Sequence, residues 1–203
     1  MKKIMNDPSQ IVTEMVQGLV RSYPDQLKQI PGTEAVMKIP DLKHRPQVGI
    51  VSGGGSGHEP THAGFVGDGM LTAAVCGQVF TSPTPDQIYE AADAGRGVFL
   101  VIKNYSGDVM NFEMAKDMAA MDDIDVRSIV VDDDIAVENS TYTQGRRGVA
   151  GTIFVHKILG AYARQGAGIE AIEELAHQIT PNIKTIGVAL SGATVPEVGK
   201  PGF

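Results

Sequence analysis

Cysteine and aromatic residues are scarce in this sequence of 203 residues, and tryptophan is absent. A single cysteine excludes an internal disulfide and a cysteine-rich zinc site. We expect this residue, Cys76, to be a small buried side chain rather than a nucleophile, because it lies in an apolar run. Aromatic residues make up only 5% of the chain, so the core must consist mainly of aliphatic, alanine and methionine side chains.

Clusters of basic residues and long apolar segments are also missing. The formal net charge is −7, and only Lys2–Lys3 and Arg146–Arg147 are adjacent basic pairs. Surfaces that bind nucleic acid or anionic membranes need clustered cations. No apolar stretch approaches the roughly 20 residues of a membrane-spanning helix, and the N-terminus lacks the apolar region of a secretory signal. We therefore expect a soluble, cytoplasmic protein that binds neither nucleic acid nor membrane.

The order of the predicted elements is typical of an α/β fold. Apolar runs predict strands at 48–51, 71–77, 98–102, 126–131 and 185–190, and a short strand at 36–39 within the proline-rich loop 25–46. Helical spacing of apolar residues predicts helices at 8–23, 85–94, 112–119, 148–163 and 170–179, and a short helix within 61–70. This alternation predicts a mainly parallel sheet flanked by helices on both sides. We expect residues 1–184 to form an N-terminal α/β domain and 185–203 to begin a second, truncated one.

A glycine-rich motif follows the first of the buried strands. Its residues are Gly53, Gly54, Gly55, Ser56, Gly57, His58 and Glu59. Glycines allow positive φ and a close approach of the main chain to a ligand, so we expect a binding loop here. The motif lacks the Lys-Ser/Thr ending of a Walker loop and the spacing of G-x-G-x-x-G, which argues against nucleotide binding by this loop.

Two later strands end in polar loops, at the sheet edge where open α/β folds bind ligands. These loops are 103–108 and 132–134. Beside the glycine motif, His58 can exchange a proton near neutral pH. Asp108 can accept the proton of an attacking hydroxyl, and Lys103 can neutralise the charge of an arriving phosphate. Each also has a structural interpretation, as a packed loop histidine, a capping carboxylate or a solvated cation.

Metal binding is not predicted. The aspartates at 132–134 could hold Mg²⁺, but such sites usually combine one or two carboxylates with substrate phosphates, so a solvated strand end is favoured. His62 follows His58 at the i+4 spacing of a helical metal pair, but His58 belongs to the glycine motif, and a packing role is preferred. The remaining histidines lack partners at ligand spacing and are expected to be surface or helix residues: His44, His156 and His177.

Six motifs together resemble the substrate-binding subunit of dihydroxyacetone kinases. They are G-G-G-S-G-H-E-P (53–60), F-T-S-P-T-P-D (80–86), I-K-N-Y-S-G-D (102–108), V-D-D-D-I-A-V (131–137), Y-T-Q-G-R-R-G-V-A-G-T (142–152) and G-K-P-G-F (199–203). The resemblance runs from the N-terminal helix to the last residue with the order kept. It implies the fold of the N-terminal domain of that family.

The resemblance also implies the members of a site. Gly55, Ser56, Gly57, His58, Lys103 and Asp108 would line a dihydroxyacetone pocket. His58 and Asp108 would be the acid–base pair that acts on the ketone oxygen and on the hydroxyl to be phosphorylated. In the family, a further histidine downstream of the G-K-P-x-F motif holds the ketone as a covalent hemiaminal, and this sequence ends before that position.

The resemblance further implies a homodimer that binds no cofactor or ATP itself. Phosphate would come from an ADP-carrying partner subunit that a phosphotransfer protein recharges, or from a fused ATP-binding domain, and ADP or ATP with Mg²⁺ would lie there. Two alternatives remain open. One is a non-catalytic paralogue that binds dihydroxyacetone and acts as a co-regulator of transcription. The other is a fatty-acid-binding protein of a related two-domain fold, against which the polar histidine and aspartate loops count.

Overall fold

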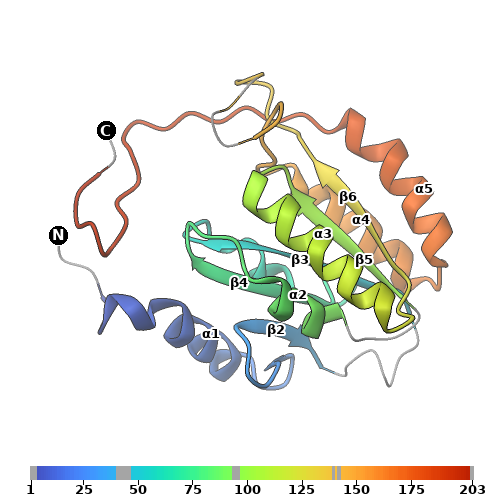
Figure 1. The fold of residues 1–203 in the computed structure, drawn as a ribbon, viewed down its shortest axis with the longest axis horizontal. Helices are drawn as coiled ribbons and strands as arrows, with labels where there is room; N and C mark the ends of the chain where they lie inside the picture. The colour runs from blue at the N-terminus through green and yellow to red at the C-terminus, as the bar shows by residue number, and fades with distance from the viewer. Residues whose placement is uncertain (1–3, 40–46, 93–96, 139, 141–142, 202–203) are drawn as a thin grey trace.

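Six strands form one mixed sheet at the centre of the molecule, in the order β1-β2-β4-β3-β5-β6 (Figure 1). The structure, a computed structural model, describes residues 4–39, 47–92, 97–138, 140 and 143–201. The parallel strands are β3 (Gly49–Ser56), β4 (Ala73–Val79), β5 (Val98–Lys103) and β6 (Val126–Val131). At the β4 edge, β1 (Leu27–Gln29) and β2 (Ala35–Lys38) continue the sheet with antiparallel pairing. The predicted, mainly parallel sheet is confirmed.

Helices cover both faces of this sheet, as predicted. One face carries α2 (Pro85–Ala92) and α3 (Ser106–Met121) (Figure 1). The other face carries α1 (Ile11–Ser22), α4 (Thr152–Arg164) and α5 (Ile169–Ile179). Short 3₁₀ helices lie at Pro8–Gln10, Ala63–Phe65 and Thr180–Asn182. Within the described residues, no helix combines the length and the apolar character needed to cross a membrane.

The apolar run 98–102 of β5 follows from the place of this strand inside the sheet, between β3 and β6. Side chains alternate between the two faces of a strand. Phe99 and Val101 pack into the core beneath α1, α4 and α5. Val98, Leu100 and Ile102 pack into the core beneath α2 and α3. A strand buried on both faces reads as a continuous hydrophobic run, which is why this element was predictable from sequence.

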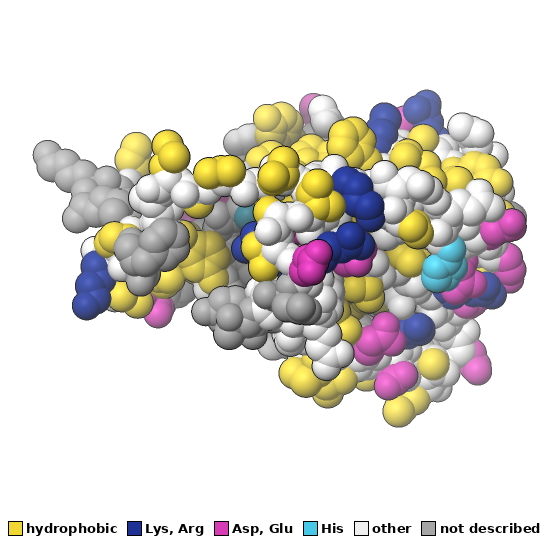
Figure 2. Space-filling view, turned by 90° about the horizontal axis from the view of Figure 1, so that it is seen from above, with side chains coloured by type: hydrophobic (Ala, Val, Ile, Leu, Met, Phe, Trp, Pro, Cys, Tyr) yellow, Lys and Arg dark blue, Asp and Glu magenta, His cyan; other side chains and the backbone are white. Residues whose placement is uncertain are grey.

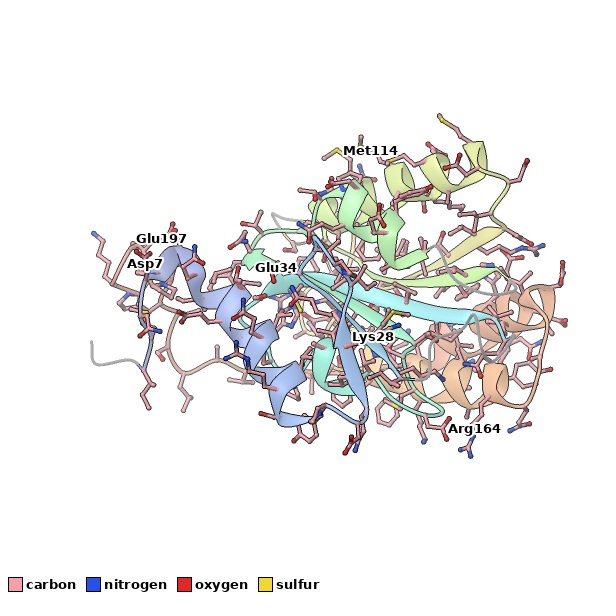
Figure 3. The ribbon with its side chains drawn as sticks, turned by 90° about the horizontal axis from the view of Figure 1, so that it is seen from below. Asp7, Lys28, Glu34, Met114, Arg164 and Glu197 are labelled. Carbon is pink, nitrogen blue, oxygen red and sulfur yellow. The ribbon has the colours of Figure 1, made fainter. Side chains whose placement is uncertain are left out.

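The segment predicted as a proline-rich loop contains a strand that the sequence analysis missed. Besides β2, which lies at the predicted short strand, the structure forms β1, and Lys28 pairs with Met37 across the two. The turn between β1 and β2 is tied to α1, because the Glu34 carboxylate accepts a hydrogen bond from the Thr13 hydroxyl at 2.6 Å. Figure 3 labels Lys28 and Glu34 on this part of the sheet. The β1 sequence, Leu-Lys-Gln, is too short and too polar to signal a strand.

The predicted strand at 185–190 is wrong. Thr185 forms only an isolated parallel bridge with Asp134. The apolar residues that follow are exposed, with Ile186 at 72%, Val188 at 88% and Leu190 at 99%. Alternating apolar residues need a neighbouring strand to pair with, and no described strand runs beside this segment. The proposed division into two domains at residue 184 stays a prediction.

Two helical glycines differ in their surroundings and give a test of the packing between α4 and the chain segment before β4. A Cβ atom on Gly160 of α4 would lie 2.3 Å from the Met70 carbonyl oxygen, whereas Gly18 of α1 has no atom within 4 Å. Gly160→Ala should lower the free energy of unfolding by about 1–3 kcal/mol through overpacking. Gly18→Ala should raise it by about 0.5–1 kcal/mol. Urea denaturation measures both, and equal effects of the two substitutions would contradict this packing.

Candidate functional site

Gly53, Gly54 and Gly55 lie inside β3 rather than in a loop after it, which corrects the sequence prediction. Their role is to let neighbouring chain segments come close. A Cβ atom on Gly53 would lie 2.6 Å from the Val75 carbonyl oxygen, and one on Gly55 would lie 2.6 Å from the Thr81 nitrogen. None of the three has the positive φ that was expected of them. The turn that leaves the sheet comes only after Ser56.

Three ionisable side chains converge on Gly54. A Cβ atom at this position would lie 3.3 Å from a carboxylate oxygen of Asp108, 3.4 Å from Cε of Lys103 and 3.5 Å from Nε2 of His58. Lys103 is the last residue of β5, and Asp108 lies in the first turn of α3. His58 follows β3 by two residues. The carboxyl ends of neighbouring parallel strands thus bring the three predicted site residues together.

The hydrogen bonds of His58 define its protonation state. Its Nδ1 donates to the Thr61 carbonyl oxygen at 2.7 Å. Its Nε2 is therefore unprotonated and accepts a hydrogen bond from Nζ of Lys103 at 2.8 Å. Burial, and then the positive charge of Lys103, lower the pKa of His58. The imidazole is therefore neutral near pH 7 and carries a lone pair at the site, as a general base requires.

Lys103 and Asp108 are both buried, with 6% and 5% of their surface exposed. This excludes the interpretation of Lys103 as a solvated cation. Burial lowers the pKa of Lys103, and the charges of Asp108, Asp133 and Glu59 oppose that shift. Burial raises the pKa of Asp108, and a hydrogen bond from Ser82 and the charge of Lys103 oppose it. The charge of each group thus stabilises the charged form of the other.

The remaining predicted pocket residues shape the main chain around these side chains. The Ser56 hydroxyl donates to the Gly77 carbonyl oxygen at 2.7 Å and so fastens β3 to β4. Gly57 has a φ of 121°, which only glycine adopts readily. The Gly57 N–H donates to the Glu59 carboxylate, at 3.0 and 3.2 Å from its two oxygens. Contact of Gly55, Ser56 and Gly57 with a ligand stays a prediction.

The aspartates that follow β6 are not a solvated strand end. Asp132 pairs with Arg146 at 3.1 Å, and the nearly fully buried Asp134 pairs with Arg147 at 2.7 Å. Seen from above, basic and acidic side chains lie side by side near the middle of this face of the molecule (Figure 2). The two arginines were noted in the sequence only as an adjacent basic pair. Here they bind the chain segment before α4 to the end of β6.

Asp133, the central aspartate of the run, is 1% exposed and supports the start of α4. Its carboxylate accepts hydrogen bonds from the N–H groups of Val149 and Gly151, both at 2.8 Å. It also accepts one from the Thr185 hydroxyl. Asp133 therefore fixes the turn that leads into α4, a role that the sequence analysis did not recognise.

Two histidines lie behind the site, in a row that begins at His58. The ring centroids of His58 and His62 are 5.5 Å apart, and those of His62 and His156 are 5.2 Å apart. Nδ1 of His62 donates to the Ser52 hydroxyl oxygen at 3.3 Å, because that hydroxyl itself donates to the Val101 carbonyl oxygen at 2.6 Å. His156 is fully buried in α4, and neither of its nitrogens has a partner among the described residues. Of the two, only His62 had a signal in the sequence, its i+4 spacing from His58.

The other candidate residues contribute no site. Cys76 is buried as predicted, and burial raises the pKa of its thiol to about 12. His177 is an exposed helix residue of α5, as predicted, and His44 lies outside the described residues. Across the part of the chain that the structure describes, no group of three or more His, Cys, Asp or Glu side chains is arranged to hold a metal ion.

The fold, and the three side chains that converge on Gly54, can be compared with known proteins. Residues 17–203 match the model of the Dak1 domain family, and the chain belongs to that family. Over its full length it is 62% identical to the dihydroxyacetone-binding subunit of the PTS-dependent dihydroxyacetone kinase of Lactococcus lactis, of which it covers 61%. The resemblance inferred from the six motifs is thereby confirmed. The chain spans about three fifths of the length of this curated relative.

Two solved structures have the same fold. The dihydroxyacetone kinase of C. freundii, in complex with AMP-PNP and Mg²⁺, aligns with a TM-score of 0.88 and 37% identity, over 96% of this chain and 37% of that one. A dihydroxyacetone kinase operon co-activator aligns with a TM-score of 0.85 and 44% identity, over 94% of this chain and 58% of that one. The same fold and family thus include proteins named as kinases and a protein named as a co-activator.

The buried histidine of α4 predicts how stability depends on pH. Burial lowers the pKa of His156 to about 3, whereas a histidine in the unfolded chain titrates near 6.5. Between these values the unfolded state binds the extra proton, so stability falls as the pH drops below about 6.5. His156→Leu should remove about 2 kcal/mol of the loss between about pH 7.5 and about pH 5. Urea unfolding at both pH values tests this, and an unchanged difference would contradict it.

The charge of Lys103 predicts a coupled change at its two neighbours. It lowers the pKa of His58 and that of Asp108, so Lys103→Met should raise both. NMR titration of the labelled imidazole and carboxyl groups measures these shifts. Lys116→Met, on the partly exposed side of α3, is the matched control and should leave both unchanged. A Lys103→Met protein in which His58 titrates as before would contradict the contact between the two side chains.

Proposed function

We propose that this chain binds dihydroxyacetone and presents it for phosphorylation to dihydroxyacetone phosphate. The observation that carries the proposal is the convergence of His58, Lys103 and Asp108 on the bare main chain of Gly54. The three side chains offer a lone pair, an ammonium and a carboxylate to a small polar ligand. The named relatives, a dihydroxyacetone-binding subunit and a dihydroxyacetone kinase, support this choice of ketone.

Each side chain has a task in this proposal that follows from its surroundings. Asp108 accepts the proton of the attacking hydroxyl, which makes the oxygen nucleophilic. His58 is held in one tautomer by Thr61, and its unprotonated Nε2 takes up a proton before it gives one to the ketone oxygen. Lys103 is buried, and its charge counters the negative charge that arrives with phosphate. Because Lys103 and Asp108 are buried, these electrostatic effects are stronger than they would be in solvent.

In the same proposal, phosphate comes from outside this chain. The glycine strand has no Walker loop, and its glycines are occupied by close contacts with β4 and with the chain after it. ADP or ATP with Mg²⁺ is therefore assigned to a partner subunit or to a fused domain. The PTS-dependent relative supports a phosphotransfer protein as the ultimate donor. A homodimer and a cytoplasmic location complete the proposal.

A second candidate is a co-activator that binds the same ketone without turning it over. It is favoured by the similarity to the dihydroxyacetone kinase operon co-activator, which is 44% identical over 94% of the chain. Both candidates need a ketone site, so binding alone does not separate them. A phosphotransfer assay with cognate partner proteins does, because a co-activator would bind dihydroxyacetone and form no phosphate ester.

The proposed acid–base pair predicts large losses of activity. In the complete natural protein with its partner present, His58→Ala and Asp108→Asn should each lower kcat for phosphotransfer by about 10²- to 10⁴-fold, because each removes a positioned proton carrier. His177→Ala, on the exposed side of α5, is the matched control and should be fully active. Coupled detection of dihydroxyacetone phosphate measures the rate, and full activity of His58→Ala would refute its assignment.

A further inference from the structure

Phe80 has a main-chain conformation that aromatic residues rarely adopt. It follows β4, and its φ is 55°, in the left-handed region. Such a conformation costs free energy for a bulky residue and persists only where the surroundings fix it. Within the described part of the chain, Asp123 is the other non-glycine residue with a positive φ, at 57°. Asp123 lies just beyond the end of α3, where aspartate tolerates this conformation, so Phe80 is the residue that requires an explanation.

The main chain around Phe80 is fixed by its contacts with β3. The Phe80 N–H donates to the Ser56 carbonyl oxygen at 2.8 Å, and the Thr81 N–H donates to the Gln78 carbonyl oxygen at 2.9 Å. A Cβ atom on Gly55 would lie only 2.6 Å from the Thr81 nitrogen. The end of β3 and the chain after β4 are therefore pressed together. Phe80 cannot relax its φ without breaking this contact.

The ring of Phe80 lies against the turn that carries His58. A Cβ atom on Gly57 would lie 2.4 Å from Cε1 of Phe80 and 3.1 Å from its Cζ. The Gly57 N–H also donates a hydrogen bond to the Glu59 carboxylate. The ring and this hydrogen bond thus fix Gly57, the residue immediately before His58.

Burial of an apolar ring does not explain this arrangement. Phe80 is 50% exposed and belongs to neither hydrophobic core. A residue that bears strain and is half exposed adds little to stability. Strained residues of this kind concentrate at functional sites, where the strain serves the geometry of the site.

We propose that Phe80 is a positioning residue, whose ring packs on Gly57 and thereby holds the His58 imidazole against Lys103. The inference rests on the proposed function only in so far as His58 carries out proton transfer there. Without the ring, the turn at Gly57 gains freedom, and His58 leaves the contact that keeps its Nε2 at 2.8 Å from Lys103 Nζ. Catalysis suffers because a displaced general base works far less well.

The substitution Phe80→Gly distinguishes a role of the residue in stability from a role in positioning His58. Phe80→Gly relieves the left-handed strain and removes the ring, so the protein should be at least as stable as the wild type. Its kcat for phosphotransfer should nevertheless fall by about 10- to 100-fold. The pKa of His58, followed by NMR, should rise, because the imidazole becomes less buried and loses its contact with the Lys103 charge. Phe80→Tyr keeps the ring and should retain the wild-type kcat and His58 titration.

Asp123→Gly is the matched control for strain relief. It should also raise stability, but it should leave kcat and the His58 titration unchanged. A Phe80→Gly protein with wild-type kcat and an unshifted His58 titration would overturn the proposal. If that variant does not fold, Phe80→Leu, which keeps an apolar side chain without the ring, must show the same loss of kcat and the same shift. The titration needs no activity, so it tests the role of Phe80 even if His58→Ala proves active and the proposed function fails.

Discussion

The close approach of other chain segments to β3 is the constraint on which the rest of the site depends. At Gly53 and Gly55, neighbouring main-chain atoms already occupy the places where side chains would begin. β4 can therefore pair with β3 up to its last residues, and the chain after β4 folds back over the strand. Between these two glycines, the atoms nearest to Gly54 belong to the side chains of Asp108, Lys103 and His58 instead of main chain. The site thus lies at a closely packed sheet edge, where three ionisable side chains meet the main chain of one glycine.

Electrostatics then determine the protonation of the three side chains. The ammonium of Lys103 is hydrogen-bonded to the imidazole of His58, and its charge favours the deprotonated form of both His58 and Asp108. It lowers the pKa of His58 and restrains the rise in the pKa of Asp108. His62 and His156 behind the site are kept neutral, first by burial. In the proposed function, the charge of Lys103 counters the negative charge that a phosphate brings.

Much of the fold could be predicted from the sequence because its strongest signals are local. The apolar run of β5 and the helical spacing in α4 and α5 depend on residues close together in the chain. The glycine run was misjudged because a glycine-rich sequence usually indicates a loop, and the contacts that make Gly53–Gly55 a strand come from residues more than 20 positions away. The segment at 185–190 has the alternation of a strand but lacks a described neighbour to pair with.

The site shows the same difference between signals that are local in the sequence and contacts that come from distant residues. His58, Lys103 and Asp108 could be predicted, because each follows a predicted strand and such strand ends meet at one edge. Asp133 could not, because its partners include the N–H groups of Val149 and Gly151, which carry no residue-specific signal. His156 could not either, since nothing in its own helix indicates that it reaches the row of imidazoles behind His58.

The central claim is that the three side chains around Gly54 bind a small ketone. A crystal structure of the complete natural protein with dihydroxyacetone tests it most directly. The account predicts that the ketone lies against Gly54, with its oxygens within hydrogen-bond distance of His58 Nε2, Lys103 Nζ and the Asp108 carboxylate. A ketone bound elsewhere, with these three groups contacting only one another, would contradict it.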